Sequence, residues 1–524
     1  MEPGVGGLTV AKSDSDLPKN WERVTIGELC DLKNGYAFKP SDWSAKGLPI
    51  VRIQNLNNPN ATFNHYMGDL RDRFIIEDGD LLFAWSGTPG TSFGAHIWRG
   101  GKAALNQHIF RIDFDESIIN KNYFMLAINQ KLNSLIQRAH GGVGLRHVTK
   151  GKFEETLIEL PPFKEQRRIA TKIDTLFSEL EKGIEALKTA REQLKVYRQA
   201  LLKHAFEGKL TANWREENID KLESTVQLLA RIRQERQTRY EQQSQGWNSA
   251  VSDWERNGKI GKKPSKPRKL DSATELLTGL LERPEGWSSL SVGQLNAEIF
   301  DGPFGSNLKG GDYVDSGVRV IRLENIGYLS FIGDKHSYIT DEKYLSLIRH
   351  TVHAGDLIFS SFITEGIKVA ILPEDIQRAV NKADCFCIRL HGTTMRNDFL
   401  AAFLSCRSAY KQIEADIHGV GRPRINTSQL KGFVVPVCSP DEQDEIMRQI
   451  EKKFSVLERF EVTISEELDR IEIVRQSILK KAFSGQLVPQ DPNDEPAAVL
   501  LERIRAESGA QNTARKMPKR KLSA

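Results

Sequence analysis

One stretch of this chain occurs twice. Residues 165–210 match residues 442–487 without a gap, and each position lies 277 residues before its counterpart. Identical pairs occur at both ends of the match, among them Glu165/Glu442, Gln166/Gln443, Phe206/Phe483 and Gly208/Gly485. A repeat constrains the fold more than any local pattern, because both copies must adopt one structure. The chain is therefore predicted to be a tandem duplication of one large unit.

The repeat extends beyond this stretch, but the spacing between its copies changes. Trp21 matches Trp287, IVRIQNL ending at Leu56 matches VIRLENI ending at Ile326, GDLLF from Gly79 matches GDLIF from Gly355, and LLARIRQE from Leu228 matches LLERIRAE from Leu500. The corresponding spacings are 266, 270, 276 and 272 residues. Each unit therefore has a globular part of variable length, a segment of fixed length and a trailing helix.

The segments of fixed length are predicted to be long helices, covering residues 161–210 and 439–487. Apolar residues recur every three or four positions along both, which is the helical period. Ser439, Pro440 and Glu442 match the N-cap, first-position and capping-box preferences of a helix start. Gly208 and Gly485 stand where a C-cap falls. We expect the two helices to pack as an antiparallel coiled coil with pseudo-two-fold symmetry; the alternative is that each packs on its own globular part.

The globular parts, residues 1–160 and 281–438, are predicted to be α+β domains, held apart by the two helices. Short β-branched and aromatic runs recur in the same order in both, among them GLPIVRIQNL and DLLFAWSG in the first copy. Residues 122–139 read as an amphipathic helix. A trailing helix with a basic linker fills residues 211–280, and a trailing helix with a basic tail fills residues 488–524. The linker RNGKIGKKPSKPRK, from Arg256, is expected to be exposed and flexible, and more a solvated run than a phosphate site.

Several classes of protein are excluded by what the sequence lacks. It has no run of about 18 apolar residues that could span a membrane, no secretory signal, and only five cysteines, which favours a reduced cytoplasmic protein. It has no phosphate loop, no zinc motif and no amino-methyltransferase motif. The net charge of +5 neither requires nor excludes nucleic acid. The sequence favours a binding protein over a catalyst.

The repeated motifs resemble a known family. Each globular part opens with Pro and Trp (Pro18 and Trp21; Pro284 and Trp287), contains R-x-x-N (Arg52 to Asn55; Arg322 to Asn325) and closes with a G-V-G loop. Each following helix begins near E-Q-x-x-I and ends in R-Q-x-[LI]-L-K-x-A-F-x-G-x-L. Over nearly its whole length the chain resembles the DNA-specificity subunit of a type I restriction–modification system.

This resemblance implies a non-catalytic, cytoplasmic subunit that binds double-stranded DNA. Each globular part would be a target-recognition domain for one half of an asymmetric bipartite site. The helices would set the spacing and dock two methyltransferase subunits, and ATP-dependent restriction subunits would join them. This chain would hold no cofactor, whereas its partners would use S-adenosylmethionine, ATP and Mg²⁺. No membrane contact is implied.

Candidate DNA contacts are side chains that can match base edges or phosphates, at strand ends and in glycine-rich loops. In the first domain they are Tyr36, Lys39, Arg52, Gln54, Asn55, Trp85, Ser86, Arg146, His147 and Lys150. In the second they are Phe304, Ser306, Asn307, Lys309, Arg322, Asn325, Ser360, Ser361, Arg422 and Arg424. Each has a structural alternative: the asparagines could cap turns, and Arg52 and Arg322 could pair with internal carboxylates.

Three other functions remain open from sequence. One is the recognition subunit of another restriction system, with a fused cleaving–methylating partner. A second is a self-contained DNA-modifying enzyme, which would need a cofactor motif that the sequence does not show. The third is a structural adaptor that uses its helices for protein partners only.

Overall fold

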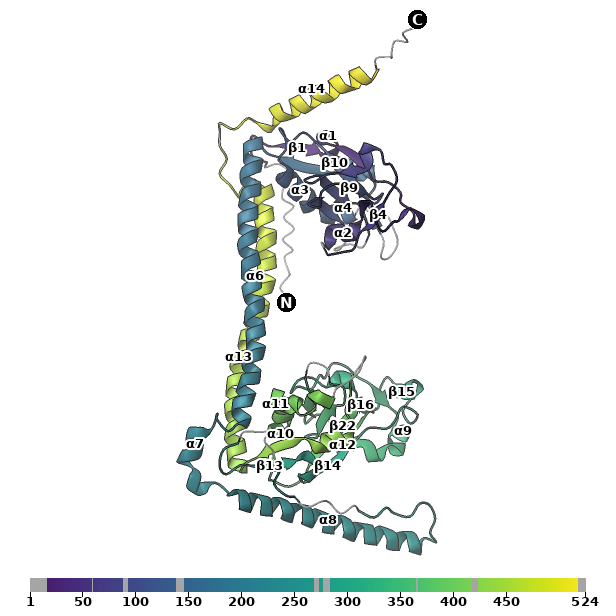
Figure 1. The fold of residues 1–524 in the computed structure, drawn as a ribbon, viewed down its shortest axis with the longest axis vertical. Coiled ribbons are helices and arrows are strands. Elements are labelled where there is room, and N and C mark those ends of the chain that lie inside the picture. The colour runs from purple at the N-terminus through teal and green to yellow at the C-terminus, as the bar shows by residue number, and fades with distance from the viewer. Residues whose placement is uncertain are drawn as a thin grey trace, which may run out of the picture. The chain divides into compact units, whose positions relative to one another are not determined.

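A computed structural model of the 524-residue chain describes residues 17–58, 60–87, 93–137, 146–267, 273–276, 283–363, 366–416 and 423–516. The chain divides into two units, one made of residues 1–187 and 466–524 and the other of residues 188–465. Each unit holds one globular domain and half of each of two long helices, α6 (Phe163–Phe206) and α13 (Pro440–Phe483) (Figure 1). None of the described helices is both long and apolar enough to cross a bilayer.

The halves of α6 and α13 pack against each other in antiparallel register in each unit. In the first unit the Arg475 guanidinium lies 4.6 Å from the centroid of the Phe177 ring. In the second unit the Arg198 guanidinium lies 4.8 Å from the centroid of the Phe454 ring. Phe177 and Phe454 are repeat partners, as are Arg198 and Arg475, so the same contact forms twice with the two helices exchanged. The predicted antiparallel pairing of the two copies is confirmed.

Both long helices end in the same hydrogen-bonded cap. Gly208 and Gly485 have φ values of +67° and +70°. In the first cap the Lys209 N–H donates to the His204 carbonyl, and in the second the Gln486 N–H donates to the Lys481 carbonyl. This is the Schellman arrangement, which favours glycine because the left-handed conformation is costly for other residues. The predicted C-caps are confirmed.

The start of α13 agrees only in part with the predicted capping box. The Ser439 hydroxyl accepts a 3.3 Å hydrogen bond from the Glu442 N–H, as an N-cap does. The Glu442 carboxylate does not reach back to the cap. Its Oε1 accepts from Thr211 and Arg215, and its Oε2 accepts from Trp287. The capping-box role of Glu442 was therefore wrong: this side chain joins the helix to the second domain.

The first domain is a mixed α+β structure built from short strands. Its strands β1 (Glu22–Thr25) and β12 (Leu157–Leu160) pair beside a four-stranded sheet of β2 (Asp31–Asn34), β10 (Ile109–Asp113), β6 (Leu81–Ala84) and β8 (Gly94–Ile97). A second sheet contains β4 (Asn64–Tyr66), β3 (Leu48–Val51), β9 (Ala103–Leu105) and β5 (Ile75–Ile76), and β7 (Ser86–Gly87) pairs with β11 (Arg146–His147). Its helices are α1 (Ile26–Leu29), α2 (Ile53–Asn57), α3 (Lys121–Gln130), α4 (Leu132–Gln137) and α5 (Lys150–Glu154), with 3-10 turns η1 (Pro40–Asp42) and η2 (Asp72–Phe74).

The second domain repeats this topology, except that its second sheet has one extra strand and an isolated bridge between Phe362 and Arg424 stands in place of the β7–β11 pair. Its strands β13 (Ser288–Ser291) and β23 (Val434–Val437) pair beside the sheet of β14 (Ala297–Phe300), β22 (Cys385–Leu390), β19 (Leu357–Ser360) and β20 (Val369–Ile371). The other sheet contains β15 (Tyr313–Val314), β17 (Tyr338–Ile339), β16 (Val318–Ile321), β21 (Ala379–Asn381) and β18 (Thr351–Val352). Its helices are α9 (Asp341–Ser346), α10 (Asn397–Leu404), α11 (Arg407–Lys411) and α12 (Thr427–Gly432), with 3-10 turns η4 (Val292–Gln294), η5 (Gly310–Asp312), η6 (Leu323–Asn325), η7 (Ile348–His350) and η8 (Glu414–Asp416).

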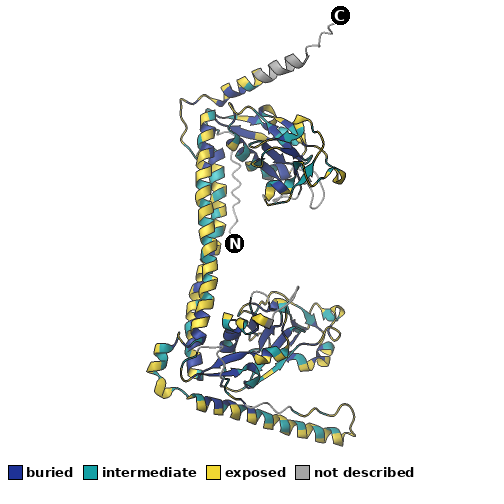
Figure 2. Ribbon diagram, viewed as in Figure 1, coloured by how far each residue is buried: buried dark blue, intermediate teal, exposed yellow. Residues whose placement is uncertain are grey.

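The repeated G-D-L-[LI]-F strand lies between two layers of apolar side chains in both domains. In β6, Leu81 and Phe83 join the core that α6 covers, whereas Leu82 joins the core of the second sheet. In β19, Leu357 and Phe359 likewise join the core that α13 covers, whereas Ile358 joins the core of the other sheet. Because side chains alternate across a strand, a strand buried on both faces must be apolar throughout. Figure 2 shows these cores as the buried parts of each domain.

Each domain is closed by a trailing helix from the other repeat. In the second unit, Leu228, Leu229 and Ile232 of α8 (Thr225–Arg256) join the second domain's core, after a short α7 (Ala212–Glu217) and 3-10 turn η3 (Ile219–Lys221). In the first unit, Leu500 and Leu501 of α14 (Ala497–Lys516) join the first domain's core. The repeated string LL-x-RIR therefore marks a docking face.

Two local expectations differ from the structure. The single helix expected over residues 122–139 is divided into α3 and α4 on either side of Lys131. The basic segment expected to be a flexible linker is exposed, but residues 257–267 run back along α8 and hydrogen-bond to it. The tryptophans that hold it, Trp247 and Trp254, lie within α8.

Candidate nucleic-acid interface

The R-x-x-N motif builds the same loop in both domains. The Arg52 N–H donates to Asn55 Oδ1 at 3.0 Å, and Asn55 Nδ2 donates to the carbonyls of Ala61 and Thr62, each at 3.3 Å. In the second domain the Arg322 N–H donates to Asn325 Oδ1 at 2.9 Å, and Asn325 Nδ2 donates to the carbonyls of Ile332 and Lys335. Both asparagines are buried, so these amides fix a loop and do not face a ligand.

The arginines of this motif rest on aromatic rings. The Arg52 guanidinium lies 5.5 Å from the centroid of the Trp43 ring, and that of Arg322 lies 5.8 Å from the Tyr313 ring. Arg322 is also 3.0 Å from Glu324, so the internal pairing that the sequence left open does occur there. A ring beneath a guanidinium restrains its orientation while leaving its N–H groups able to reach bases or phosphates.

Predicted lysines stand beside the same rings. Lys39 is the N-cap of η1 and Trp43 is its C-cap, and Lys309 and Tyr313 hold the same positions on η5. The Lys39 N–H donates to Asp42 at 2.7 Å, and the Lys309 N–H donates to Asp312 at 2.6 Å. Each domain therefore carries one basic–aromatic cluster, Lys39–Trp43–Arg52 or Lys309–Tyr313–Arg322. Trp43 and Tyr313 are not among the residues predicted from sequence, although they share the 270-residue spacing of Arg52 and Arg322.

Other predicted residues flank the clusters. Phe304 is 72% exposed and stands beside Ser306 and Asn307, which are also exposed. Tyr36 is less free, because its ring packs against Phe38 at a centroid distance of 4.9 Å. Gln54 is exposed on α2.

The strand ends beyond β6 and β19 form a second group of predicted residues. In the first domain, buried Ser86 Oγ lies 2.8 Å from His147 Nδ1, and the Trp85 ring lies 5.9 Å from the His147 ring. Among the described residues Trp85 Nε1 is buried without a hydrogen-bond partner. Burial, together with the charges of His147 and Arg52, lowers the pKa of His108, whose ring lies 5.4 Å from that of Trp85. The charge of Arg52 thus acts on His108, which contacts the strand-end group through the Trp85 ring.

The second domain replaces this group with an arginine–carboxylate pair. Ser361 Oγ donates to Asp384 Oδ1 at 3.0 Å, and Arg424 Nη1 lies 3.3 Å from the same oxygen. The Arg424 side chain is 62% exposed and lies over the Phe362 ring. Ser360 is buried and donates to the Phe362 carbonyl. The two domains therefore offer different side chains at equivalent places.

The remaining predicted residues are less informative. Lys150 Nζ donates to the Leu32 carbonyl at 3.3 Å and lies 3.5 Å from Glu154. The backbone of Arg146, in β11, pairs with that of Gly87, in β7. The side chain of Arg146 lies outside the described part of the structure. Arg422 and both G-V-G loops lie outside the described residues.

Known proteins share this architecture. Residues 18–188 match the family model described as "Type I restriction modification DNA specificity domain". The chain is 27% identical over 529 residues to the type I restriction enzyme EcoBI specificity subunit of Escherichia coli, covering 98% of both chains. It is 41% identical over 188 residues to the EcoAI specificity subunit of the same species, covering 34% of this chain and 32% of that one.

A solved structure shows the same fold. Its description is the structural basis of complex assembly and conformational transition of the type I R-M system. The TM-score is 0.60 at 15% sequence identity, and the match covers 90% of this chain and all of that chain. The resemblance seen in the repeated motifs is confirmed. Over 98% of its length the chain is thus similar to a specificity subunit of a type I restriction enzyme, and residues 18–188 match the DNA specificity domain of that family.

Proposed function

We propose that each domain reads one half of a bipartite double-stranded DNA site through its basic–aromatic cluster. The observation that carries this proposal is the recurrence of Lys, aromatic ring and Arg in both domains at one spacing, with each arginine on a loop held by a buried asparagine. Arginine can bind the guanine edge through two hydrogen bonds, and lysine suits phosphates.

The two domains would read different half-sites because their surrounding side chains differ. Trp85 and His147 stand in the first domain where Ser361 and Arg424 stand in the second. In this proposal the half-buried Arg52 and Arg322 contact DNA together with exposed residues, namely Lys39, Gln54, Ser306, Asn307, Lys309 and Arg424. The buried Asn55, Ser86, Asn325, Ser360 and Ser361 only position them.

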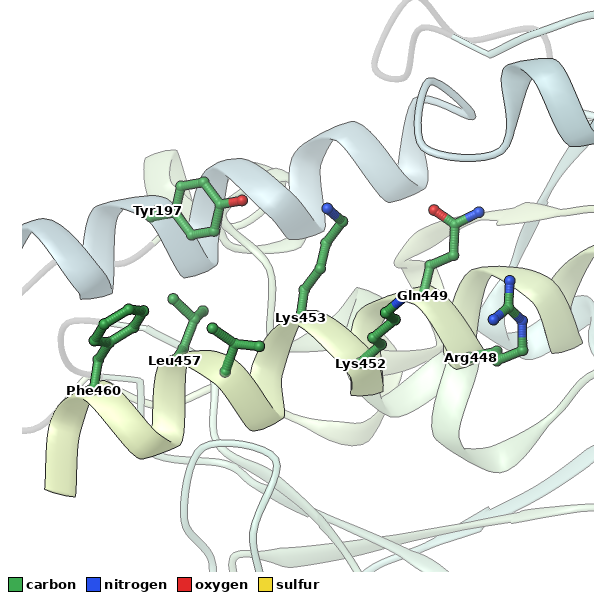
Figure 3. A pocket seen from close by; sticks show the side chains of 8 residues that line it. Tyr197, Arg448, Gln449, Lys452, Lys453, Leu457 and Phe460 are labelled. Atoms are coloured by element: carbon green, nitrogen blue, oxygen red, sulfur yellow. The ribbon is translucent and has the colours of Figure 1, made fainter. Parts of the chain in front are cut away.

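The long helices would dock two methyltransferase subunits. Val196 and Tyr197 of α6 are exposed in the second unit, and their repeat partners Ile473 and Val474 of α13 are exposed in the first. Beside Tyr197, a groove of about 520 Å³ runs along α13 past Val456 and Phe460 (Figure 3). Figure 2 shows that much of the length of these helices is exposed. Two equivalent apolar pairs suit two copies of one partner, because large exposed apolar groups mark interaction sites.

The chemistry would then belong to those partners. S-adenosylmethionine would be held by the methyltransferase subunits, and ATP and Mg²⁺ by restriction subunits. This chain would contribute recognition and assembly without catalysis, in the cytoplasm where the host DNA lies.

Alanine variants of the two cluster arginines test the readout. In the complex with modification subunits, Arg52→Ala should relax the first half-site alone and Arg322→Ala the second alone. Arg73 and Arg378 also lie over aromatic rings, Phe74 and Tyr344, but outside the clusters, so their alanine variants are matched controls. Methylation of DNA carrying every single-base change in each half-site provides the measurement. Unchanged base preference in both cluster variants would contradict the proposal.

A separate experiment tests the docking surface. Tyr197→Glu and Val474→Glu should each reduce the bound methyltransferase subunits from two to one, measured by light scattering of the purified complex. Lys188→Glu serves as the control, because Lys188 is exposed nine residues earlier, on the opposite side of α6 from Tyr197. Full occupancy in both variants would place the partners elsewhere.

A further inference from the structure

Two tryptophans of α8 hold the basic segment that follows this helix. Trp254 Nε1 donates to the Gly261 carbonyl at 3.2 Å, and Trp247 Nε1 donates to the Pro264 carbonyl at 2.9 Å. The chain reverses just after the helix, where Gly258 and Lys259 both have positive φ. Residues 257–267 therefore return antiparallel to the helix instead of leaving it.

The spacing of these contacts fits an extended strand beside a helix. Trp247 and Trp254 are seven residues apart, so they lie on one face of α8 about 10.5 Å from each other. The acceptors Gly261 and Pro264 are three residues apart, which is about 10 Å in an extended chain. The match lets both indole N–H groups bind without distorting either segment.

The same indoles hold lysines over their rings. The ammonium groups of Lys259 and Lys263 lie 5.9 and 6.0 Å from the centroid of the Trp254 ring, and that of Lys266 lies 5.7 Å from the Trp247 ring. Lys262 lies between them, and all four are exposed. None forms an ion pair within the described part of the chain. Between Asn257 and Leu270 the sequence has six basic residues and no acidic one.

This structure stands clear of the second domain. The contacts of α8 with that domain continue to Arg239, whose Nη2 lies 3.6 Å from Glu298. Beyond it, no hydrogen bond or ion pair joins residues 240–267 to the described residues of the second domain. From Arg239 to Arg256 the helix extends about 26 Å. We call residues 240–267 the arm; its free end points to the same side of the view as β15 and α9 (Figure 1).

We propose that the arm is a second DNA-binding site, which holds the phosphates of the duplex outside the half-site that the second domain reads. The proposal rests on the proposed function and extends it to DNA of any sequence. Lysine is depleted from protein–protein interfaces but binds phosphate as a point charge, which favours DNA over an acidic protein. Fixing the ammonium groups over the indoles lowers the entropy lost when they bind.

Salt dependence of DNA binding tests the arm. The complex with modification subunits is titrated with its target in a short duplex and in one extended by about 15 base pairs on both sides. Changing Lys259, Lys262, Lys263 and Lys266 together to alanine should make the negative slope of log affinity against log salt shallower, and only on the long duplex. The expected decrease is about 0.9 for each phosphate that the arm no longer neutralises. The fourfold arginine variant, which keeps the charge, should retain the wild-type slope.

The outcomes separate the alternatives. Equal slopes for wild type and alanine variant on the long duplex would overturn the proposal, as would an equal decrease on the short duplex. A different outcome is that the alanine variant loses a subunit while the complex that stays intact binds DNA as the wild type does. That result would indicate that the arm binds an acidic protein partner, and it would also overturn the proposal. Trp247→Leu with Trp254→Leu should give part of the decrease, and a wild-type slope would refute the role of the indoles. A long duplex of scrambled sequence should show the same change in salt dependence when the arm lysines are removed. A failure of the proposed sequence readout can therefore be distinguished from a failure of the arm proposal.

Discussion

The indole nitrogen of Trp287 donates a 2.8 Å hydrogen bond to Oε2 of Glu442, 155 residues later and in the first turn of α13. Trp21 and Glu165 repeat this bond at 3.0 Å at the start of α6. The two anchors differ in the second carboxylate oxygen. Glu442 Oε1 accepts from Thr211 and Arg215, whereas Glu165 Oε1 is buried without a partner among the described residues. The same tryptophan–glutamate hydrogen bond thus joins each domain to a long helix. Within the described part of the chain, the glutamate has a positively charged partner in the second unit only.

The first prediction compares the two glutamates. Glu442→Gln should destabilise the second unit by about 3 kcal/mol, because it leaves the largely buried guanidinium of Arg215 without its charge partner. Glu165→Gln should change the free energy of unfolding of the first unit by less than about 1 kcal/mol, because the amide oxygen can still accept from Trp21. Hydrogen exchange of the two domains measures both effects. Equal costs in the two variants would contradict this assignment.

The second prediction concerns pH. Burial and the nearby Asp494 carboxylate raise the pKa of Glu165, against the lowering effects of Trp21 and Arg168. The folded state therefore holds this proton at pH values where the unfolded chain has lost it. As pH rises from the unfolded pKa through the higher folded pKa, the first unit should lose stability. The difference in unfolding free energy between wild type and Glu165→Gln should follow that window; a difference independent of pH would show that the pKa is not raised.

The third prediction separates contact from positioning. Arg424→Ala should weaken DNA binding by about 1–3 kcal/mol and relax one position of the second half-site if the guanidinium reaches a base. Asn325→Ala should instead loosen the loop between η6 and β17, because the carbonyls of Ile332 and Lys335 lose their donor. Hydrogen exchange at residues 326–337 should rise in Asn325→Ala and stay unchanged in Arg424→Ala. Faster exchange in both would mean that Arg424 also supports the fold.

The fourth prediction concerns the spacer between half-sites. Seven residues inserted into both α6 and α13, at positions that pack against each other, add about 10.5 Å and preserve the apolar face. The preferred spacer should lengthen by about three base pairs at 3.4 Å each. The same insertion in one helix alone breaks the register and should abolish specific methylation. An unchanged spacer after the paired insertion would show that the helices do not set it.

The repeated and periodic features of this fold could be predicted from sequence. The apolar period and the terminal glycines fixed the extent of α6 and α13, and matching strings located β3 with β16 and β6 with β19. The strand β19 was clear because both its faces are buried, which leaves a continuous apolar run.

The contacts made by polar side chains across loops could not be predicted. Asn55 and Asn325 bind carbonyls in loops whose lengths differ between the two copies. The motif alone therefore did not show whether these asparagines hold a loop or contact a base. The basic run after Arg256 was visible as charge. Its attachment to Trp247 and Trp254 depends on the distance between the two indoles along the helix matching the distance between their acceptors along the extended segment. This match can be seen only once the path of residues 257–267 is known.

Selection of DNA from a random duplex pool by the complex of this chain with modification subunits tests the two-reader proposal most directly. We expect two unlike half-sites at one fixed spacing, with Arg322→Ala altering one half and leaving the other half and the spacing intact. A single contiguous motif, or a pool with no enriched sequence, would contradict it.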